Sequence, residues 1–299
     1  MQQPRSHERP GALAPGARVH LFAPSSGFDR ARFDAGHALL AARYRVSQGA
    51  SVFAREGFLA GSDAARLADV VTGLADPEAR ALIAARGGYG ATRLLPHLDV
   101  ARVREAGKWL VGFSDVTALH AVWARAGLCS LHAPMVCSLP DADPPVRAAW
   151  HALLEGGPPA PLTDLTVVHP GRAEGRLFGG NLTVLAALAG TPYFPPLDDV
   201  VLVLEDVGER PYRLDRVLTM LLQTGLLTGV RAVVLGGFTE AAPGADGVRA
   251  EDVLAERLKQ LGVPVLADAP FGHVRNNCPL LLGAWARVDT AARRVDFAA

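Results

Sequence analysis

The sequence has little cysteine, no net charge and no long hydrophobic run, and each absence excludes a class of protein. Its 299 residues include three cysteines, Cys129, Cys137 and Cys278, with neither a CxxC pair nor a zinc-ligand spacing. We therefore expect no disulfide framework and no structural metal. The 30 basic residues balance the 30 acidic residues, which argues against nucleic-acid binding. Because no run of about 18 apolar residues occurs, no membrane-spanning helix is predicted.

The beginning of the chain is also poor in apolar residues. Residues 1–17 are rich in proline, glycine, arginine and histidine and lack the apolar core of a secretory signal. We expect a flexible leader there and a protein that stays in the cytoplasm. The odd number of cysteines suits the same reducing compartment.

Strand and helix patterns alternate along the first half of the chain. Apolar runs at 18–23, 81–85 and 109–113 end in small or turn-forming residues and precede stretches with helical character. This alternation predicts an α/β fold in which a mostly parallel sheet is covered by helices on both faces.

The alternating pattern is interrupted where prolines and glycines gather. We therefore expect an N-terminal domain over residues 18–139 and a linker over 140–172 that contains one short helix from Val146 to Leu154. Strand and helix patterns resume beyond the linker, and they predict a C-terminal domain of mixed α/β structure over residues 173–299.

The segment Gly112-Phe113-Ser114-Asp115 places a serine between a predicted buried strand and a predicted helix. A tight turn of this kind exposes the serine oxygen, and the N–H of Asp115, at the positive end of the helix, can stabilise an oxyanion. The alternative is that Ser114 only caps the helix. Val116 stands where the G-x-S-x-G elbow has its second glycine, so this is not the usual α/β-hydrolase signature.

A nucleophilic serine needs a histidine base and a carboxylate that orients the base. His273 follows a predicted strand in a loop, where catalytic side chains commonly lie. His132 is a rival, and either histidine could instead be structural. Glu205 and Asp206 end another predicted strand, and only one of them can face the site, because neighbouring side chains on a strand point to opposite faces. We expect Glu205 to face it and Asp206 to belong to solvated ion pairs.

Together these residues resemble the LD-carboxypeptidase family of serine peptidases, also called muramoyltetrapeptide carboxypeptidases. The resemblance extends over almost the whole chain and keeps several separate motifs in the family's order. The motifs of the first half are Ala23-Pro24-Ser25-Ser26-Gly27, Ala60-Gly61-Ser62-Asp63 with Arg66, Arg86-Gly87-Gly88-Tyr89-Gly90, Arg93-Leu94-Leu95, and Lys108 with Val111 to Leu119. The motifs of the second half are Gly179-Gly180-Asn181-Leu182, Leu204-Glu205-Asp206-Val207, Pro211 to Arg216, and Phe271-Gly272-His273.

The resemblance implies a role for each candidate residue. Ser114 would be the nucleophile, His273 the base and Glu205 the acid that orients the base. The backbone N–H groups of Gly88 and Asp115 would form the oxyanion hole, and no metal or other cofactor would take part. The implied fold is a flavodoxin-like, doubly wound parallel sheet followed by a smaller C-terminal mixed α/β domain, with the active site between the two domains.

The implied reaction is hydrolysis of the amide between an L-configured centre and a C-terminal D-amino acid, as in the release of D-alanine from murein tetrapeptides during cytoplasmic cell-wall recycling. The implied partners are a small muropeptide substrate and a second copy of the chain in a homodimer. Arg86, Tyr89 and Arg93 are candidates for substrate binding, and either arginine could hold the terminal carboxylate. Ala133 replaces the glycine usual in the family, which makes the substrate preference harder to predict.

Three other interpretations stay open. A dinucleotide site at Gly88-Tyr89-Gly90 is a weak one, because Arg93 stands where the last glycine should be. The second is the microcin C immunity branch of the same family, which cleaves an amide in an aminoacyl-adenylate-like antibiotic; no aromatic-rich insertion for stacking the base is obvious here. The third is a non-catalytic muropeptide-binding protein, against which the presence of all three triad residue types argues.

Overall fold

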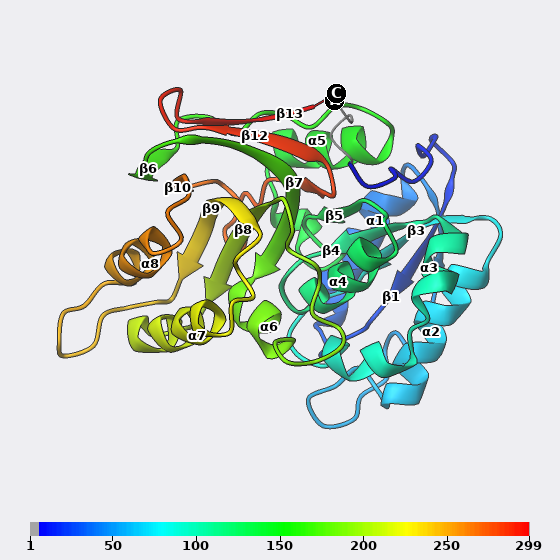
Figure 1. Ribbon diagram of the computed structural model, residues 1–299. Coiled ribbons are helices and arrows are strands. Elements are labelled where there is room, and N and C mark those ends of the chain that lie inside the picture. Colours follow the sequence, from blue (N-terminus) through cyan, green and yellow to red (C-terminus); the bar gives the residue numbers. More distant parts are fainter. Residues whose placement is uncertain (1–5, 299) are drawn as a thin grey trace.

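The computed structural model describes residues 6–298, which form two β-sheets side by side with helices packed against them (Figure 1). The strands of the first sheet are β1 (Arg18–Phe22), β2 (Arg45–Gln48), β3 (Ala79–Ala84), β4 (Trp109–Gly112), β5 (Ser130–His132) and β11 (Leu280–Leu282). Their order is β11-β5-β4-β3-β1-β2. All neighbouring pairs are parallel except β11 with β5. The order from β2 to β5 is that of a flavodoxin-like sheet, which confirms the predicted fold class.

Helices cover both faces of this sheet because its strands are apolar on both sides. The helices are α1 (Arg30–Ala41), α2 (Asp63–Ala75), α3 (Val100–Ala106), α4 (Thr117–Arg125) and α5 (Pro144–Leu154). Successive side chains of a strand point to opposite faces. Leu82 of β3 accordingly packs in one apolar cluster with residues of α2 and α4, and Ile83 packs in another with residues of α1 and α5.

The second sheet is mixed. Its strands are β6 (Thr166–His169), β7 (Arg172–Asn181), β8 (Val200–Val207), β9 (Val230–Thr239), β10 (Val265–Ala267), β12 (Trp285–Asp289) and β13 (Arg294–Phe297). Their order is β13-β12-β7-β8-β9-β10-β6, with parallel pairing from β7 to β10 and antiparallel pairing outside them. Its helices are α6 (Leu182–Ala187), α7 (Pro211–Gln223) and α8 (Ala250–Lys259). Mixed α/β structure is as predicted for this half of the chain.

One apolar cluster joins the two halves of the molecule. It contains Leu119 of α4, Leu185 of α6 and Leu202 of β8, all fully buried. Strand β11, from the last part of the chain, also crosses over and pairs with β5 of the first sheet. The two halves are therefore packed against each other, and side chains from both can meet between them.

The expected flexible leader differs from its predicted form, at least from residue 6 on. Residues 6–17 of the expected flexible leader are attached to the body: Leu13 is 3% exposed and its N–H donates to the carbonyl of Leu154. Residues 1–5 lie outside the described part of the chain. The short helix expected within the linker is present as α5, whose Trp150 is fully buried against the first sheet. Apolar side chains attach both polar segments to the body, because their burial is favourable.

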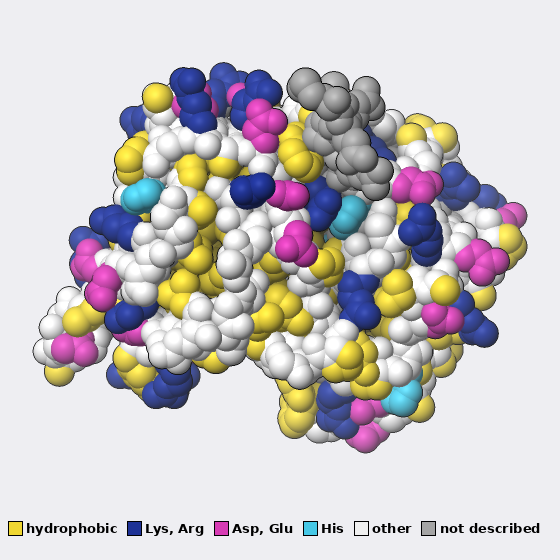
Figure 2. Space-filling model, viewed as in Figure 1, with side chains coloured by type: hydrophobic (Ala, Val, Ile, Leu, Met, Phe, Trp, Pro, Cys, Tyr) yellow, Lys and Arg dark blue, Asp and Glu magenta, His cyan; other side chains and the backbone are white. Residues whose placement is uncertain are grey.

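The surface carries both signs of charge. Figure 2 shows Lys and Arg side chains interspersed with Asp and Glu on the face in view, in keeping with the balanced composition. Among residues 6–298, no helix combines the length and the apolar character that crossing a membrane requires.

Candidate active site

Ser114 lies in a sharp turn between a strand and a helix. Strand β4 ends at Gly112, and a short 3₁₀ turn over Ser114–Val116 leads into α4. Ser114 has a φ of 62°, in the left-handed region that residues other than glycine seldom adopt. Such strain persists only where the surrounding structure holds it, and it occurs preferentially at functional sites. The turn brings the Ser114 hydroxyl to a cavity between the two halves of the molecule.

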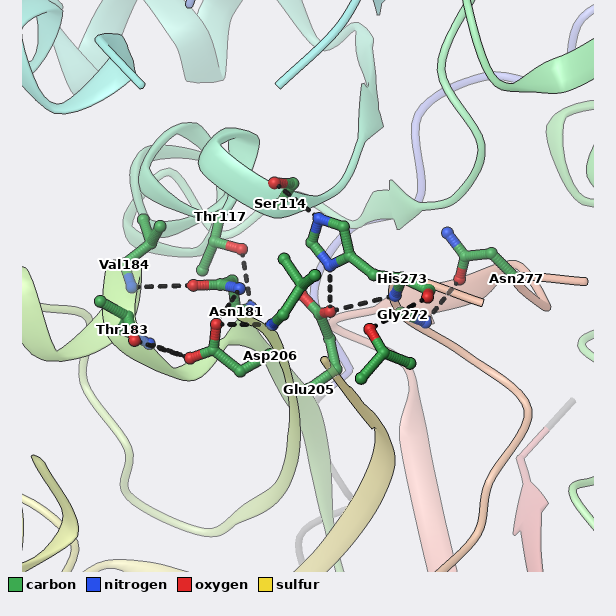
Figure 3. A network of polar contacts seen from close by, with 12 residues as sticks. Ser114, Thr117, Asn181, Thr183, Val184, Glu205, Asp206, Gly272, His273 and Asn277 are labelled. Carbon is green, nitrogen blue, oxygen red and sulfur yellow. Dashed lines mark hydrogen bonds and ion pairs between the residues drawn. The ribbon is translucent and has the colours of Figure 1, made fainter. Parts of the chain in front are cut away.

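Glu205 and His273 reach the same place from the second sheet. Glu205 lies near the end of β8 and is fully buried, and His273 lies in the loop after β10. The Ser114 hydroxyl oxygen is 3.1 Å from His273 Nε2, and His273 Nδ1 is 2.6 Å from Glu205 Oε2 (Figure 3). The three side chains predicted from the sequence therefore form one continuous series of hydrogen bonds.

The loop that carries His273 is held against Glu205 by its backbone. The N–H of His273 donates to Glu205 Oε2 at 3.2 Å, and the N–H of Gly272 donates to Asn277 Oδ1 at 2.8 Å. Gly272 has a φ of 101°, and a Cβ atom there would lie 2.6 Å from the Cβ of Glu205. Only glycine allows this close approach. The sequence did not single out Asn277, although it is 3% exposed and fixes this loop.

The cavity has a volume of about 570 Å³ and includes Arg86, Gly88, Ser114 and His273 in its wall. This volume is within the range of small-molecule sites, roughly 300–1,000 Å³. A Cβ atom on the neighbouring Gly87 would lie 3.0 Å from the Ser114 hydroxyl oxygen and 3.3 Å from the backbone nitrogen of Asp115. The glycine-rich turn after β3 is thus packed directly against the serine turn.

Buried polar side chains hold these turns in place. Asp115 does not line the cavity, and its carboxylate accepts hydrogen bonds from Ser25 Oγ at 2.6 Å and from the N–H of Ala91 at 2.8 Å. Burial raises the pKa of Asp115. The fully buried Arg66 guanidinium donates to the carbonyls of Pro24 and Gly90. Arg66 belongs to a motif of the sequence, but only the structure shows that its side chain binds the backbone of both turns.

Two of the predicted substrate-binding residues lie outside the cavity wall. Arg93 pairs with Asp63 at 2.8 Å. Tyr89 is 49% exposed, and its ring centroid lies 5.7 Å from that of Phe58. Neither residue lines the cavity, whereas Arg86 does. Ala133, the departure from the family pattern, is fully buried and is also outside the wall.

His132, the rival base, lies in an apolar environment. Its side chain is fully buried between the rings of Phe113 and Phe271, each with a centroid 5.8 Å away. Burial lowers the pKa of His132 to about 3, so its imidazole is neutral at physiological pH. No hydrogen bond connects His132 with Ser114 among residues 6–298, and the structure favours a packing role for it.

The prediction for Asp206 was wrong. It is 3% exposed and accepts hydrogen bonds from Asn181 and Thr183 instead of joining solvated ion pairs.

The described part of the chain gives no support for metal or cysteine chemistry. No group of three or more His, Cys, Asp and Glu side chains within residues 6–298 is arranged to hold a metal ion. Burial raises the pKa of the Cys278 thiol, which disfavours its nucleophilic thiolate form.

The sequence matches known carboxypeptidases along most of its length. A model of the LD-carboxypeptidase N-terminal domain matches residues 19–133, and a model of the C-terminal domain matches residues 174–288. A putative carboxypeptidase of Synechocystis sp. is 36% identical over 298 residues, 98% of each chain. The murein tetrapeptide carboxypeptidase of Pseudomonas aeruginosa is 36% identical over 246 residues, 77% of this chain and 78% of the relative.

Solved structures share the fold. The muramoyltetrapeptide carboxypeptidase from Oxalobacter formigenes superposes with a TM-score of 0.85 at 29% identity, covering 94% of this chain and 99% of the other. The microcin C7 self-immunity protein with aspartyl sulfamoyl adenosine gives 0.86 at 22% identity, covering 98% of each, and shows the fold alone. Fold and sequence together define a carboxypeptidase built from two α/β halves. The chain belongs to the LD-carboxypeptidase family.

Proposed function

We propose that this protein is a serine carboxypeptidase that hydrolyses the amide between an L-configured centre and a C-terminal D-amino acid. The observation that supports this most directly is the hydrogen-bond series from Ser114 through His273 to Glu205 at the edge of the cavity. The name of the Pseudomonas aeruginosa relative supports a murein tetrapeptide as substrate, and the family resemblance implies D-alanine as the released product.

In the proposed mechanism the Ser114 hydroxyl attacks the scissile carbonyl carbon while His273 Nε2 takes its proton. Glu205 Oε2 holds the Nδ1–H of the same ring, which fixes the tautomer and stabilises the imidazolium that forms. His273 then protonates the leaving D-amino acid as the amide bond breaks. A water molecule, deprotonated by His273, attacks the acyl-enzyme and regenerates Ser114.

The developing oxyanion needs donors that are in place before the reaction. We propose the backbone N–H groups of Gly88 and Asp115 for this role. The close packing of the glycine-rich turn on Ser114 and on the Asp115 nitrogen supports the pair. The position of Asp115 in the 3₁₀ turn that leads into α4 adds a favourable helix dipole.

The carboxylate of the C-terminal residue needs a cation in the cavity, and we propose Arg86. Its guanidinium lines the cavity and donates to the carbonyl of Gly27 at 2.7 Å, which fixes its position. An arginine fork matches the geometry of a carboxylate. Arg93, already paired with Asp63, and Tyr89 are the weaker candidates of the original three.

The setting of the reaction is part of the proposal. The family resemblance implies that recycled murein tetrapeptides are cleaved in the cytoplasm, and it leads us to propose a cytoplasmic homodimer. Analytical ultracentrifugation of the purified full chain tests the homodimer, and a sedimentation coefficient of the monomer at micromolar concentration would contradict it.

The reaction is tested by incubating the purified protein with murein tetrapeptide and measuring released amino acids by mass spectrometry. We expect D-alanine and the tripeptide as products, and no release from the Ser114→Ala variant. Two parallel incubations test for other substrates: an L,L-tripeptide represents an ordinary peptide, and an aminoacyl sulfamoyl adenosine represents an aminoacyl-adenylate-like amide. Turnover of either in preference to the tetrapeptide would contradict the proposed substrate, and equal turnover by Ser114→Ala would contradict the serine mechanism.

A further inference from the structure

The carboxylate next to Glu205 is buried and carries four hydrogen bonds. Asp206 Oδ1 accepts from Asn181 Nδ2 at 3.0 Å and from the N–H of Val207 at 2.8 Å. Its Oδ2 accepts from the N–H and the hydroxyl of Thr183, at 3.0 and 2.7 Å. Buried carboxylates need such donors to offset the loss of water. Because these bonds are directional, Asp206 holds the Asn181 side chain in one orientation.

Asn181 in turn contacts the helix that follows the serine turn. Its backbone N–H donates to Thr117 Oγ1 at 3.0 Å, and Thr117 is the first residue of α4, three positions after Ser114. Thr117 is fully buried. A Cβ atom on Gly180 would lie 2.5 Å from Thr117 Oγ1, so the end of β7 lies directly against the start of α4. Figure 3 shows this connection beside the triad.

We propose that Asp206, Asn181, Thr183 and Thr117, here called the Asp206 network, position the Ser114 hydroxyl relative to His273. This inference rests on the proposed triad. Ser114 belongs to the first sheet, whereas Glu205 and His273 belong to the second, so their hydrogen bond depends on how the two sheets meet. The shared apolar cluster holds the sheets together without directional contacts, and the pairing of β11 with β5 and the hydrogen bonds between Asn276 and Asp143 join other elements. The Asp206 network supplies a directional contact between them.

The end of β8 would then position both the base His273 and the nucleophile Ser114. Glu205 and Asp206 are neighbours on β8, and their side chains point to opposite faces, as expected for a strand. Glu205 binds the base, and Asp206 binds the residue that contacts the nucleophile's helix. Asp206 and Thr117 are thus positioning residues, which act through Ser114 and His273 and do not line the cavity.

The substitution Thr117→Val tests the proposal, because it keeps the shape of the side chain and removes the acceptor for the Asn181 N–H. The rate at which a fluorophosphonate labels Ser114 reports the reactivity of the hydroxyl without peptide binding. Misplacement of reacting groups by about 1 Å can cost on the order of 10²-fold in rate, and we expect labelling and kcat to fall together by about 10- to 100-fold, with KM close to the wild-type value. The thermal unfolding midpoint is measured alongside.

Three variants complete the test. Thr117→Ser keeps the hydroxyl and should label close to the wild-type rate. Thr219→Val removes a hydroxyl in α7 that donates to Asp215, and it should label like the wild type. Asp206→Asn keeps the shape but replaces acceptors by an N–H₂ group, and it should slow labelling even if Thr117→Val does not fold.

The outcomes separate this proposal from the proposed triad. If Ser114→Ala labels like the wild type, the triad itself is wrong. If labelling requires Ser114, but folded Thr117→Val or Asp206→Asn reacts at the wild-type rate with only a lower unfolding midpoint, the network is merely structural and the inference is overturned.

Discussion

Replacing Glu205 with glutamine removes one charge from the triad with almost no change in shape. Glu205 is fully buried, and its Oε2 lies 2.6 Å from His273 Nδ1. In the proposed transition state the ring has gained the Ser114 proton, so the carboxylate faces a positive charge. Two unit charges about 4 Å apart interact by about 4 kcal/mol at an effective dielectric constant of about 20. Because about 1.4 kcal/mol corresponds to a factor of ten in rate, we expect kcat to fall about 10³-fold.

The assay is D-alanine release from murein tetrapeptide over a range of concentrations. Glu205 does not line the cavity, so KM should stay near the wild-type value while kcat falls. Glu209→Gln is the matched control, because Glu209 is only partly buried and pairs with Arg213 at 3.7 Å outside the triad; it should keep the wild-type kcat. A kcat of Glu205→Gln within about tenfold of the wild type would refute the electrostatic argument.

Three further predictions concern the surroundings of the triad. Gly88 has a φ of +109°, and a Cβ atom there would lie 2.5 Å from Ser26 Oγ. Gly88→Ala should therefore displace the oxyanion donor and lower kcat by about 10²-fold, and an unchanged kcat in steady-state assays would contradict the role of Gly88. Arg86→Gln should raise KM for the tetrapeptide at least about tenfold, because the guanidinium would no longer bind the C-terminal carboxylate of the substrate. Arg93→Gln should leave KM unchanged, and equal effects of the two substitutions on KM would count against Arg86. Burial lowers the pKa of His120 to about 4 and of His132 to about 3. In the unfolded chain both histidines become protonated near pH 6.5, whereas in the folded chain they stay neutral to a lower pH. Protonation therefore favours the unfolded chain, and the free energy of unfolding decreases as the pH falls from about 6.5 toward 4. The urea midpoint should therefore drop between about pH 7 and pH 4.5, and this drop should be smaller in a folded His132→Leu variant.

Local pattern was sufficient to predict the elements that carry the site. The alternation of apolar runs, small-residue turns and helical spacing predicts a parallel sheet, because such strands must be covered on both faces. The same pattern places Ser114 at the end of a strand and Glu205 at the end of another, which is where the structure has them. Motif order along the chain also led to the family.

Segments of unclear periodicity were harder to interpret. Residues 6–17 and the region around α5 have polar, proline-rich sequences, yet Leu13 and Trp150 are buried. A few apolar side chains suffice to attach such a segment, and their partners lie far away in the sequence. Strand β11 likewise pairs with β5, a strand much earlier in the chain, and no local pattern indicates which sheet edge it joins.

By itself, the sequence determined the family, the α/β class and the residue types available for the chemistry, because these depend on local order along the chain. Only the tertiary structure decided that Ser114, His273 and Glu205 hydrogen-bond in series, that Arg86 lines the cavity while Arg93 does not, and that Asp206 is buried. These properties depend on distances between residues up to 159 positions apart. Such distances are set by how the two sheets pack, which no local pattern specifies.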